Sequence, residues 1–166
     1  MQMQEPGILI QPFDRNYAEA VIALILPIQQ IEFGVPVTAA DQPDLLDIPA
    51  FYFKGKGNFW IAVANGRVVG TIGLLDYGEG GFALRKMFVE KLYRGAAMGI
   101  AQSLWQVAKD WVVQQEGKDI YLGTVEILKA AHRFYEKNGF IRVEQQQLPE
   151  NFPRMPVDTV FYRFVV

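Results

Sequence analysis

Short hydrophobic runs separated by Gly, Pro and Asn recur along this chain, and longer stretches carry apolar residues three or four positions apart. Runs rich in Ile, Val and Phe with such boundaries are typical of β-strands. They predict strands at residues 7–12, 59–64, 68–76, 82–89, 120–124, 140–146 and 159–165. The Asn65-Gly66 pair predicts a tight hairpin, because a type I′ turn needs positive φ at both central residues.

Helical spacing of apolar residues predicts three helices, at 14–26, 98–115 and 126–138, with a continuation of the first at 28–33. Asp14 is expected to cap the first helix, and Asn138-Gly139 to end the third. A strand–helix crossover joins the strands at 82–89 and 120–124, so we expect them to lie parallel. The order predicts a mixed sheet with helices on its faces, an α/β (α+β) architecture.

Two proline-containing connections are predicted to be irregular. Residues 34–57 contain Pro36, Pro43 and Pro49, with a short helix expected at 41–46. Such a segment either lines a binding cleft or simply connects a helix to the sheet. Residues 148–158 hold three further prolines, which favour a constrained loop over a helix.

The composition narrows the range of functions. The chain has 166 residues, enough for one domain with a sizeable core, and its 51% hydrophobic and 20% charged residues indicate a globular protein. A net charge of −2 argues against a nucleic-acid-binding surface. With no cysteine and a single histidine, His132, we expect no metal site and no histidine triad. The N-terminus lacks the pattern of a signal peptide, and no apolar run reaches the roughly 20 residues of a membrane span, so we expect a cytoplasmic protein.

A cluster of small residues separates the strand at 82–89 from the long helix. It contains Arg94, Gly95, Ala96, Ala97 and Gly99. Backbone N–H groups at a helix start have no intrahelical partner, and small side chains let an anion approach them. The turn therefore predicts a phosphate or pyrophosphate site. The alternative is a small-residue loop that packs a helix onto a sheet.

Two motifs resemble one family. Arg94-x-x-Ala97-x-Gly99, followed by Ala101, resembles the Arg/Gln-x-x-Gly-x-Gly/Ala signature of the GNAT superfamily of N-acetyltransferases, with Ala97 at a usual glycine position. Residues 131–140 resemble the family's Ala-x-x-Phe/Leu-Tyr-Glu-Lys-x-Gly-Phe segment, one helix and one strand further on. The resemblance implies a single GNAT domain over residues 1–166. Its fold would be a mixed, mostly antiparallel sheet of six or seven strands flanked by about four helices.

The resemblance also implies acetyl-CoA as cosubstrate, without a metal. In the family the turn holds the pyrophosphate, and the pantetheine arm lies between two diverging strands, here 82–89 and 120–124. The implied cofactor-binding residues are Met87, Phe88, Val89, Arg94, Gly95, Ala96, Ala97, Met98, Gly99, Ala101 and Phe134. A backbone N–H near Phe88 would stabilise the thioester oxygen as it gains charge.

Tyr135 stands where the family often places its general acid. Helical spacing predicts a buried stripe of Ile127, Ala131 and Phe134, with Tyr135 at its edge. The alternative is that Tyr135 is a boundary residue of the core. His132, one turn earlier, is either a proton relay or, as we expect, a histidine at the solvent edge.

The general base is not marked in the sequence. Leu128 occupies the place of a common asparagine, and Gly123 the place where N-terminal acetyltransferases carry a glutamate. The remaining sources are a water relay or one of five carboxylates: Glu32, Asp76, Glu79, Glu126 and Asp158.

The acceptor is expected to be a primary amine, on a small molecule or a peptide, acetylated by direct transfer. Candidate acceptor residues are Glu32, Phe33, Phe152 and Arg154, and Arg154 would favour an acceptor with a carboxylate. The loop at 148–158 either shapes this pocket or contacts a second subunit in a homodimer. Two other functions fit the same motifs: a non-catalytic CoA-binding or sensing domain, and transfer of a longer acyl group.

Overall fold

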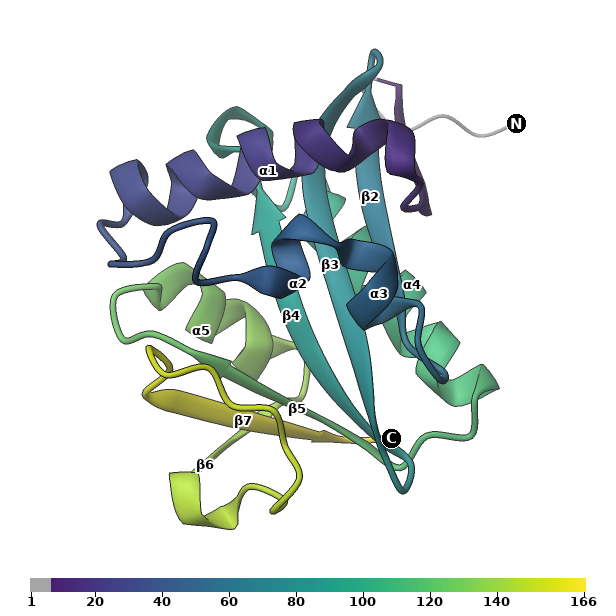
Figure 1. Ribbon diagram of the computed structural model, residues 1–166, viewed down its shortest axis with the longest axis vertical. Helices are drawn as coiled ribbons and strands as arrows, with labels where there is room; N and C mark the ends of the chain where they lie inside the picture. The colour runs from purple at the N-terminus through teal and green to yellow at the C-terminus, as the bar shows by residue number, and fades with distance from the viewer. Residues whose placement is uncertain (1–6) are drawn as a thin grey trace.

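A seven-stranded sheet forms the centre of the computed structural model, which describes residues 7–166 (Figure 1). The strand order is β1-β2-β3-β4-β5-β7-β6, and β4 and β5 form its parallel pair, with the other neighbours antiparallel. The strands are β1 (Ile8–Pro12), β2 (Asn58–Ala64), β3 (Arg67–Gly78), β4 (Gly81–Val89), β5 (Asp119–Thr124), β6 (Ile141–Val143) and β7 (Val160–Val165). The predicted fold class and the parallel β4–β5 pairing are confirmed.

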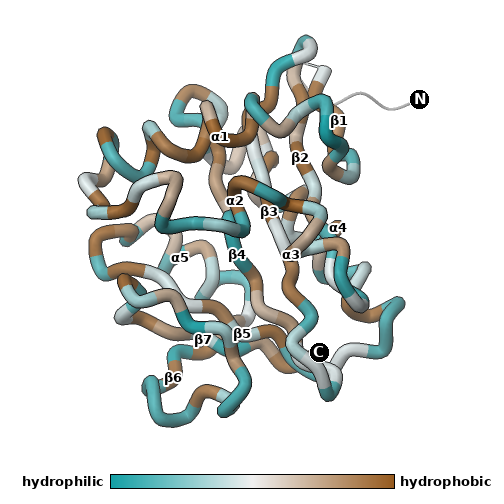
Figure 2. Tube along the Cα trace, viewed as in Figure 1, coloured by the Kyte–Doolittle hydropathy of each residue, from teal (hydrophilic) through white to brown (hydrophobic). Residues whose placement is uncertain are grey.

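Helices cover both faces of the sheet (Figure 1). One face carries α1 (Ala18–Pro27), α2 (Pro43–Leu46) and α3 (Ile48–Tyr52), and the other carries α4 (Ile100–Gln114) and α5 (Lys129–Lys137). Shorter turns are η1 (Arg15–Tyr17), the π-helical η2 (Ile28–Glu32), η3 (Lys91–Tyr93) and η4 (Gln145–Gln147). Each face has its own hydrophobic core, and Figure 2 shows the hydrophobic residues concentrated along α1, β2 and β3.

Local signals in the sequence explain several elements. Asn65 and Gly66 have φ of 53° and 79°, as the hairpin turn requires. Asp14 Oδ1 accepts from the N–H of Asn16 at 2.8 Å, which confirms its capping role. Asp47 accepts from the N–H of Ala50 and starts α3, a helix that the sequence analysis did not separate from the irregular segment.

The strand predicted at 140–146 is shorter than expected. It ends at Val143, because Glu144 and Gln147 form a capping box that starts η4. The third helix starts at Lys129 rather than near Glu126, so Ile127 lies before the helix.

The strands β4 and β5 diverge after a short parallel contact. Their pairing runs only from Gly81–Ala83 to Asp119–Tyr121. Beyond it, Lys86 has a φ of 53°, and the register places two residues of β4 opposite Ile72, which is a β-bulge. Thr71 Oγ1 donates to the Lys86 carbonyl at 2.6 Å and holds the bulge in place. The result is the V-shaped separation of β4 and β5 in Figure 1.

Residues 1–6, which begin the segment used to argue against a signal peptide, lie outside the described residues. Within residues 7–166, no helix combines the length and apolar character needed to cross a bilayer.

Candidate active site

A groove of about 470 Å³ lies between the end of β4 and the start of α5. It includes Met87, Phe88 and Val89 on one side and Phe134 and Tyr135 on the other. Arg94, Gly95 and Ala101 close it at the start of α4. The structure therefore brings together eight of the residues that the family resemblance selected from distant parts of the chain. Ala96, Ala97, Met98 and Gly99 belong to the same turn but do not line the groove.

The turn before α4 presents free backbone donors. Gly95 and Gly99 have positive φ, 110° and 67°, which glycine adopts without strain, whereas Ala97 does not. The methyl group of Ala97 is therefore compatible with this turn. Within the described part of the chain, no group accepts from the N–H of Ala96, Ala97, Ile100 or Ala101. Unpaired N–H groups at the start of a 15-residue helix suit a phosphate anion.

The Arg94 side chain connects this turn to η2. Its Nε donates to the Val89 carbonyl at 2.7 Å, and its Nη2 donates to Glu32 Oε1 at 2.7 Å. The hydrogen bond from Arg94 lowers the pKa of Glu32, which is therefore ionised at neutral pH. Glu32, a predicted acceptor residue and candidate base, lines neither the groove nor the small cavity described below.

Tyr135 lies on the buried face of α5. Only 6% exposed, it packs against Phe140 and Tyr162 with ring centroids 5.5 and 5.8 Å away. Its hydroxyl makes no hydrogen bond with any residue in the described range. Burial, reinforced by the nearby charge of Asp158, raises the pKa of Tyr135. The phenol is therefore protonated at neutral pH and borders the groove.

The predicted buried stripe on this helix is correct for Ala131 and Phe134, which pack half-buried against the core, and wrong for Ile127. Ile127 is 56% exposed, and the buried residues of α5 are His132 and Tyr135. Packing of this face against Phe140 and Tyr162 overrides the local hydrophobic pattern. The expected solvent-edge position of His132 is wrong too, since the side chain is 7% exposed and its Nε2 lies 2.9 Å from the Val125 carbonyl oxygen.

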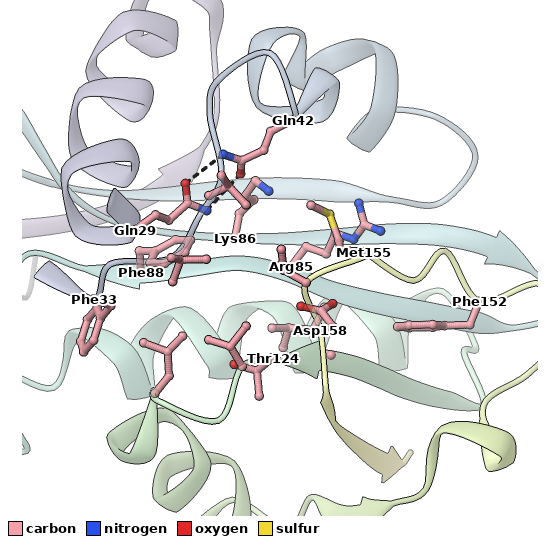
Figure 3. Close-up of a pocket in the computed structure, with 17 residues that line it drawn as sticks. Gln29, Phe33, Gln42, Arg85, Lys86, Phe88, Thr124, Phe152, Met155 and Asp158 are labelled. Atoms are coloured by element: carbon pink, nitrogen blue, oxygen red, sulfur yellow. Dashed lines mark hydrogen bonds between the residues drawn. The ribbon is translucent and has the colours of Figure 1, made fainter. Parts of the chain in front are cut away.

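A second, smaller cavity of about 110 Å³ opens beside the groove (Figure 3). The two cavities share Phe33, Phe88 and Leu128, so they meet at the point where β4 and β5 diverge. In Figure 3 the hydrogen-bonded amides of Gln29 and Gln42 lie on one side of the small cavity. Asp158 and Thr124 lie on the other.

The small cavity carries charges of both signs. Arg85 and Lys86 line it from β4, and Asp158 lines it from the loop before β7. Behind them lies Asp44, 3% exposed, with its Oδ2 3.3 Å from Lys86 Nζ and 4.0 Å from Arg85 Nη1. Tyr52 donates its hydroxyl to the same carboxylate at 2.6 Å. Burial lowers the pKa of Lys86, with the charge of Asp44 opposing that effect.

Asp158 occupies space that Gly123 leaves open. A Cβ on Gly123 would lie 2.5 Å from Asp158 Oδ2, so a larger residue there would displace the carboxylate. Burial raises the pKa of Asp158 to about 6, against the opposing charges of Arg85 and Lys86. Of the five candidate carboxylates, Asp158 is the one that lines either the groove or the small cavity.

The other predicted acceptor residues are divided between the two cavities and the surface. Phe33 lines both cavities and Phe152 lines the small one. Arg154 lines neither, and its Nη1 lies 3.5 Å from the Asp158 carbonyl oxygen. Arg85 and Lys86 were not predicted from the sequence to belong to the site. The available signal was a pair of adjacent cations inside an otherwise apolar strand.

The sequence of this chain matches the sequence model of a known protein family. The sequence model described as "Acetyltransferase (GNAT) family" matches residues 22–140, well over half of the chain. The chain belongs to the GNAT acetyltransferase family. The matched range includes the diverging strands, the turn before α4 and Tyr135 of this GNAT domain.

Solved structures agree with that assignment. A GNAT-family acetyltransferase from Staphylococcus aureus Mu50 is 38% identical, with a TM-score of 0.92 over 95% of this chain and 98% of that one. The PaiA N-acetyltransferase of Thermoplasma acidophilum, solved with coenzyme A, has a TM-score of 0.74 over 96% of this chain and 99% of that one. At 14% identity it shows the shared fold alone.

Curated relatives include N-acetylaspartate synthetases. The protein of that name from Danio rerio is 34% identical over 125 residues, which is 72% of this chain and 43% of the relative. The human protein of that name is 35% identical over 99 residues, 58% of this chain and 32% of the relative. The GNAT chain therefore spans less than half the length of these two relatives.

Proposed function

We propose that this GNAT protein transfers the acetyl group of acetyl-CoA directly to a primary amine on a small molecule or a peptide. The supporting observation is the junction of the two cavities, with Tyr135 bordering the groove and Asp158 lining the small cavity. The unpaired N–H groups of the turn before α4 fit a pyrophosphate. The divergence of β4 and β5 leaves backbone of β4 available to the pantetheine arm.

Tyr135 and Asp158 have complementary roles in this proposal. The cosubstrate supplies a reactive thioester. Asp158 accepts a proton from the incoming ammonium and releases it to solvent, and the free amine forms the new C–N bond as the C–S bond breaks. Tyr135 donates its proton to the departing sulfur and recovers one from the acetylated nitrogen. A backbone N–H of β4 near Phe88 stabilises the carbonyl oxygen.

We further propose that residues 1–166 form one acetyltransferase domain that works in the cytoplasm. A continuous sheet with one core on each face supports the single domain. A homodimer in which the 148–158 loop contacts a second subunit stays a prediction, and the lining of the small cavity by Phe152 and Asp158 favours the pocket role of that loop.

The proposal is tested by measuring release of the CoA thiol from acetyl-CoA with a panel of primary amines. The panel includes aspartate, because relatives of this chain are named N-acetylaspartate synthetases. Amine-dependent thiol release and a product heavier by one acetyl group are expected. If acetyl-CoA binds but no amine supports turnover, the alternative of a CoA-binding or sensing domain replaces the enzyme. Faster turnover with a longer acyl-CoA would instead change the assigned donor.

A further inference from the structure

The small cavity contains an arrangement of charges that a simple amine would leave unsatisfied. We propose, building on the acetyltransferase function above, that it binds a free α-amino acid, with Arg85 binding the α-carboxylate and Asp158 holding the α-ammonium group. The assignment rests on which charges already have partners, on the position of Asp158 and on the size of the cavity.

Lys86 is paired with a carboxylate more closely than Arg85 is. Asp44 lies closest to Lys86, at 3.3 Å, and that pair is buried together, with 5% and 4% of the side chains exposed. Arg85 is 4.0 Å from the same carboxylate. Its guanidinium donates to the carbonyl oxygen of Pro153 and lies within hydrogen-bond reach of the Tyr52 hydroxyl. A guanidinium has five N–H donors and a planar edge that matches a carboxylate, so Arg85 keeps capacity for a further partner.

Asp158 supplies the opposite charge at the same cavity. Arg85 and Asp158 thus present one positive and one negative group, once Lys86 is paired with Asp44. An amino acid zwitterion carries the matching pair, one ammonium and one carboxylate. An amine without a carboxylate would pair with Asp158 and leave the mostly buried Arg85 with only its 4.0 Å contact to Asp44, a carboxylate that it shares with Lys86, which is unfavourable.

The position of Asp158 sets the direction of the acceptor. Its charge contributes to the raised pKa of Tyr135, so the carboxylate and the phenol lie within electrostatic reach. The ammonium would therefore lie toward the groove, where the thioester is expected, and the carboxylate would lie toward Arg85.

The dimensions of the cavity favour a compact acceptor. Gln29 and Gln42 donate amide N–H groups to each other at 3.0 and 2.9 Å and form a wall opposite Asp158. The remaining volume of about 110 Å³ is small compared with the 470 Å³ groove. These features favour a free amino acid over a peptide chain.

The first experiment compares each of the twenty amino acids with its own α-carboxamide as acceptor, using wild-type enzyme and thiol release. The amide removes the negative charge and barely changes the size. The amine of the amide is also less basic, so a larger fraction of it is unprotonated at neutral pH. Intrinsic reactivity therefore favours the amide. We expect the best free acid to have a kcat/KM about 10- to 100-fold above that of its amide, the range for one charged hydrogen-bonded contact. Equal or better turnover of the amides would overturn the proposal while leaving acetyl transfer established. No turnover with any amine in the wider panel would instead remove the proposed function itself.

The second experiment tests whether Arg85 is the residue that binds the α-carboxylate. Arg85→Gln is expected to raise KM for the free acid about 10-fold or more, to reduce the preference for the acid over its amide by a similar factor, and to keep acetyl-CoA binding, which also reports folding. Arg85→Lys should restore part of the preference for the acid. Arg142→Gln is the matched control, because Arg142 is exposed and lines neither cavity. Loss of the acid preference in Arg154→Gln but not in Arg85→Gln would contradict the assignment.

Discussion

The groove and the small cavity meet at three residues but are built from different parts of the protein. The groove depends on backbone: unpaired N–H groups at the start of α4, two glycines with positive φ and a strand that has separated from its neighbour. The small cavity depends on charged side chains from β4 and from the loop before β7. This difference suits a shared, invariant cosubstrate on one side and a particular acceptor on the other. Substitutions should therefore separate the two regions.

The largest effect is expected at Tyr135, where the two regions cooperate. Tyr135→Phe should lower kcat about 100- to 1000-fold, because it removes the proton donor for the departing sulfur. Acetyl-CoA affinity should change little, since the ring and its packing against Phe140 remain. Steady-state kinetics and calorimetry on the same preparation check both statements. If this variant keeps a kcat near that of wild type, Tyr135 is a boundary residue of the core and not the general acid.

The second-largest effect concerns the buried pair of Asp44 and Lys86 beside the small cavity. Asp44→Asn should destabilise the protein by about 3 kcal/mol, because it leaves Lys86 buried without its carboxylate partner. The hydrogen bond from Tyr52 can persist to the amide oxygen. Urea unfolding measures the loss.

Glu126→Gln is the control for that substitution. It removes a carboxylate from the exposed Glu126–Lys129 pair, which should hardly change the unfolding curve. A similar small change in Asp44→Asn would show that the buried pair does not stabilise the fold.

A third prediction concerns the pH dependence of turnover. Asp158 acts as a base only when ionised, and its pKa is raised to about 6, so kcat/KM should fall about tenfold per pH unit below that value. The charged groups that act on it are Arg85, Lys86 and Arg154, with the Tyr135 phenol nearby. Asp158→Asn should lower kcat and abolish this acidic limb. A limb that persists in the variant would assign it to another group.

The smallest predicted effect is a gain in stability from the same substitution. The pKa of Asp158 is higher in the folded protein than the ordinary aspartate value of 3.8, so the ionised carboxylate destabilises the folded state above about pH 6. Asp158→Asn should then be more stable than wild type at pH 7.5, by about 1 to 2 kcal/mol after allowance for partial exposure. The gain should shrink as the pH falls from about 6 to 4, where the native side chain becomes protonated. Thermal unfolding of wild type and Asp158→Asn at pH 7.5 and at about pH 4 tests whether the variant is the more stable protein and whether its gain shrinks.

The groove could be predicted from the sequence because two motifs of a known family mark its residues, although these motifs lie in distant parts of the chain. The glycines of the turn and the strand–helix crossover are recognisable from neighbouring residues, and the resemblance supplies the pairing of the turn with the helix that carries Tyr135. The small cavity depends on contacts between distant residues. Asp44 and Lys86 are 42 positions apart (86 − 44), and Asp158 faces Gly123 from 35 positions away (158 − 123). No pattern within one element indicates such pairs.

The incorrect predictions for Ile127 and His132 also result from contacts between residues that are distant in the chain. Ile127 was predicted to lie on the buried face from hydrophobic spacing, and His132 was expected at the solvent edge. The later start of α5 and its packing against Phe140 and Tyr162 then decided which face is buried. Tertiary packing thus determined which side chains of the helix are most deeply buried, although the existence of the helix and its end at Asn138 were predicted correctly.

The most direct test of the central claim is acetyl-CoA binding by calorimetry to three proteins: wild type, Gly99→Glu and Gly66→Glu. Both glycines have positive φ, 67° and 79°, and open space at the position of an added Cβ, so the strain of substitution is matched. Only Gly99 lies in the turn before α4, where a carboxylate would repel a pyrophosphate. We predict that wild type and Gly66→Glu bind acetyl-CoA and that Gly99→Glu does not. Absence of binding to wild type, or equal binding to all three proteins, would contradict the account.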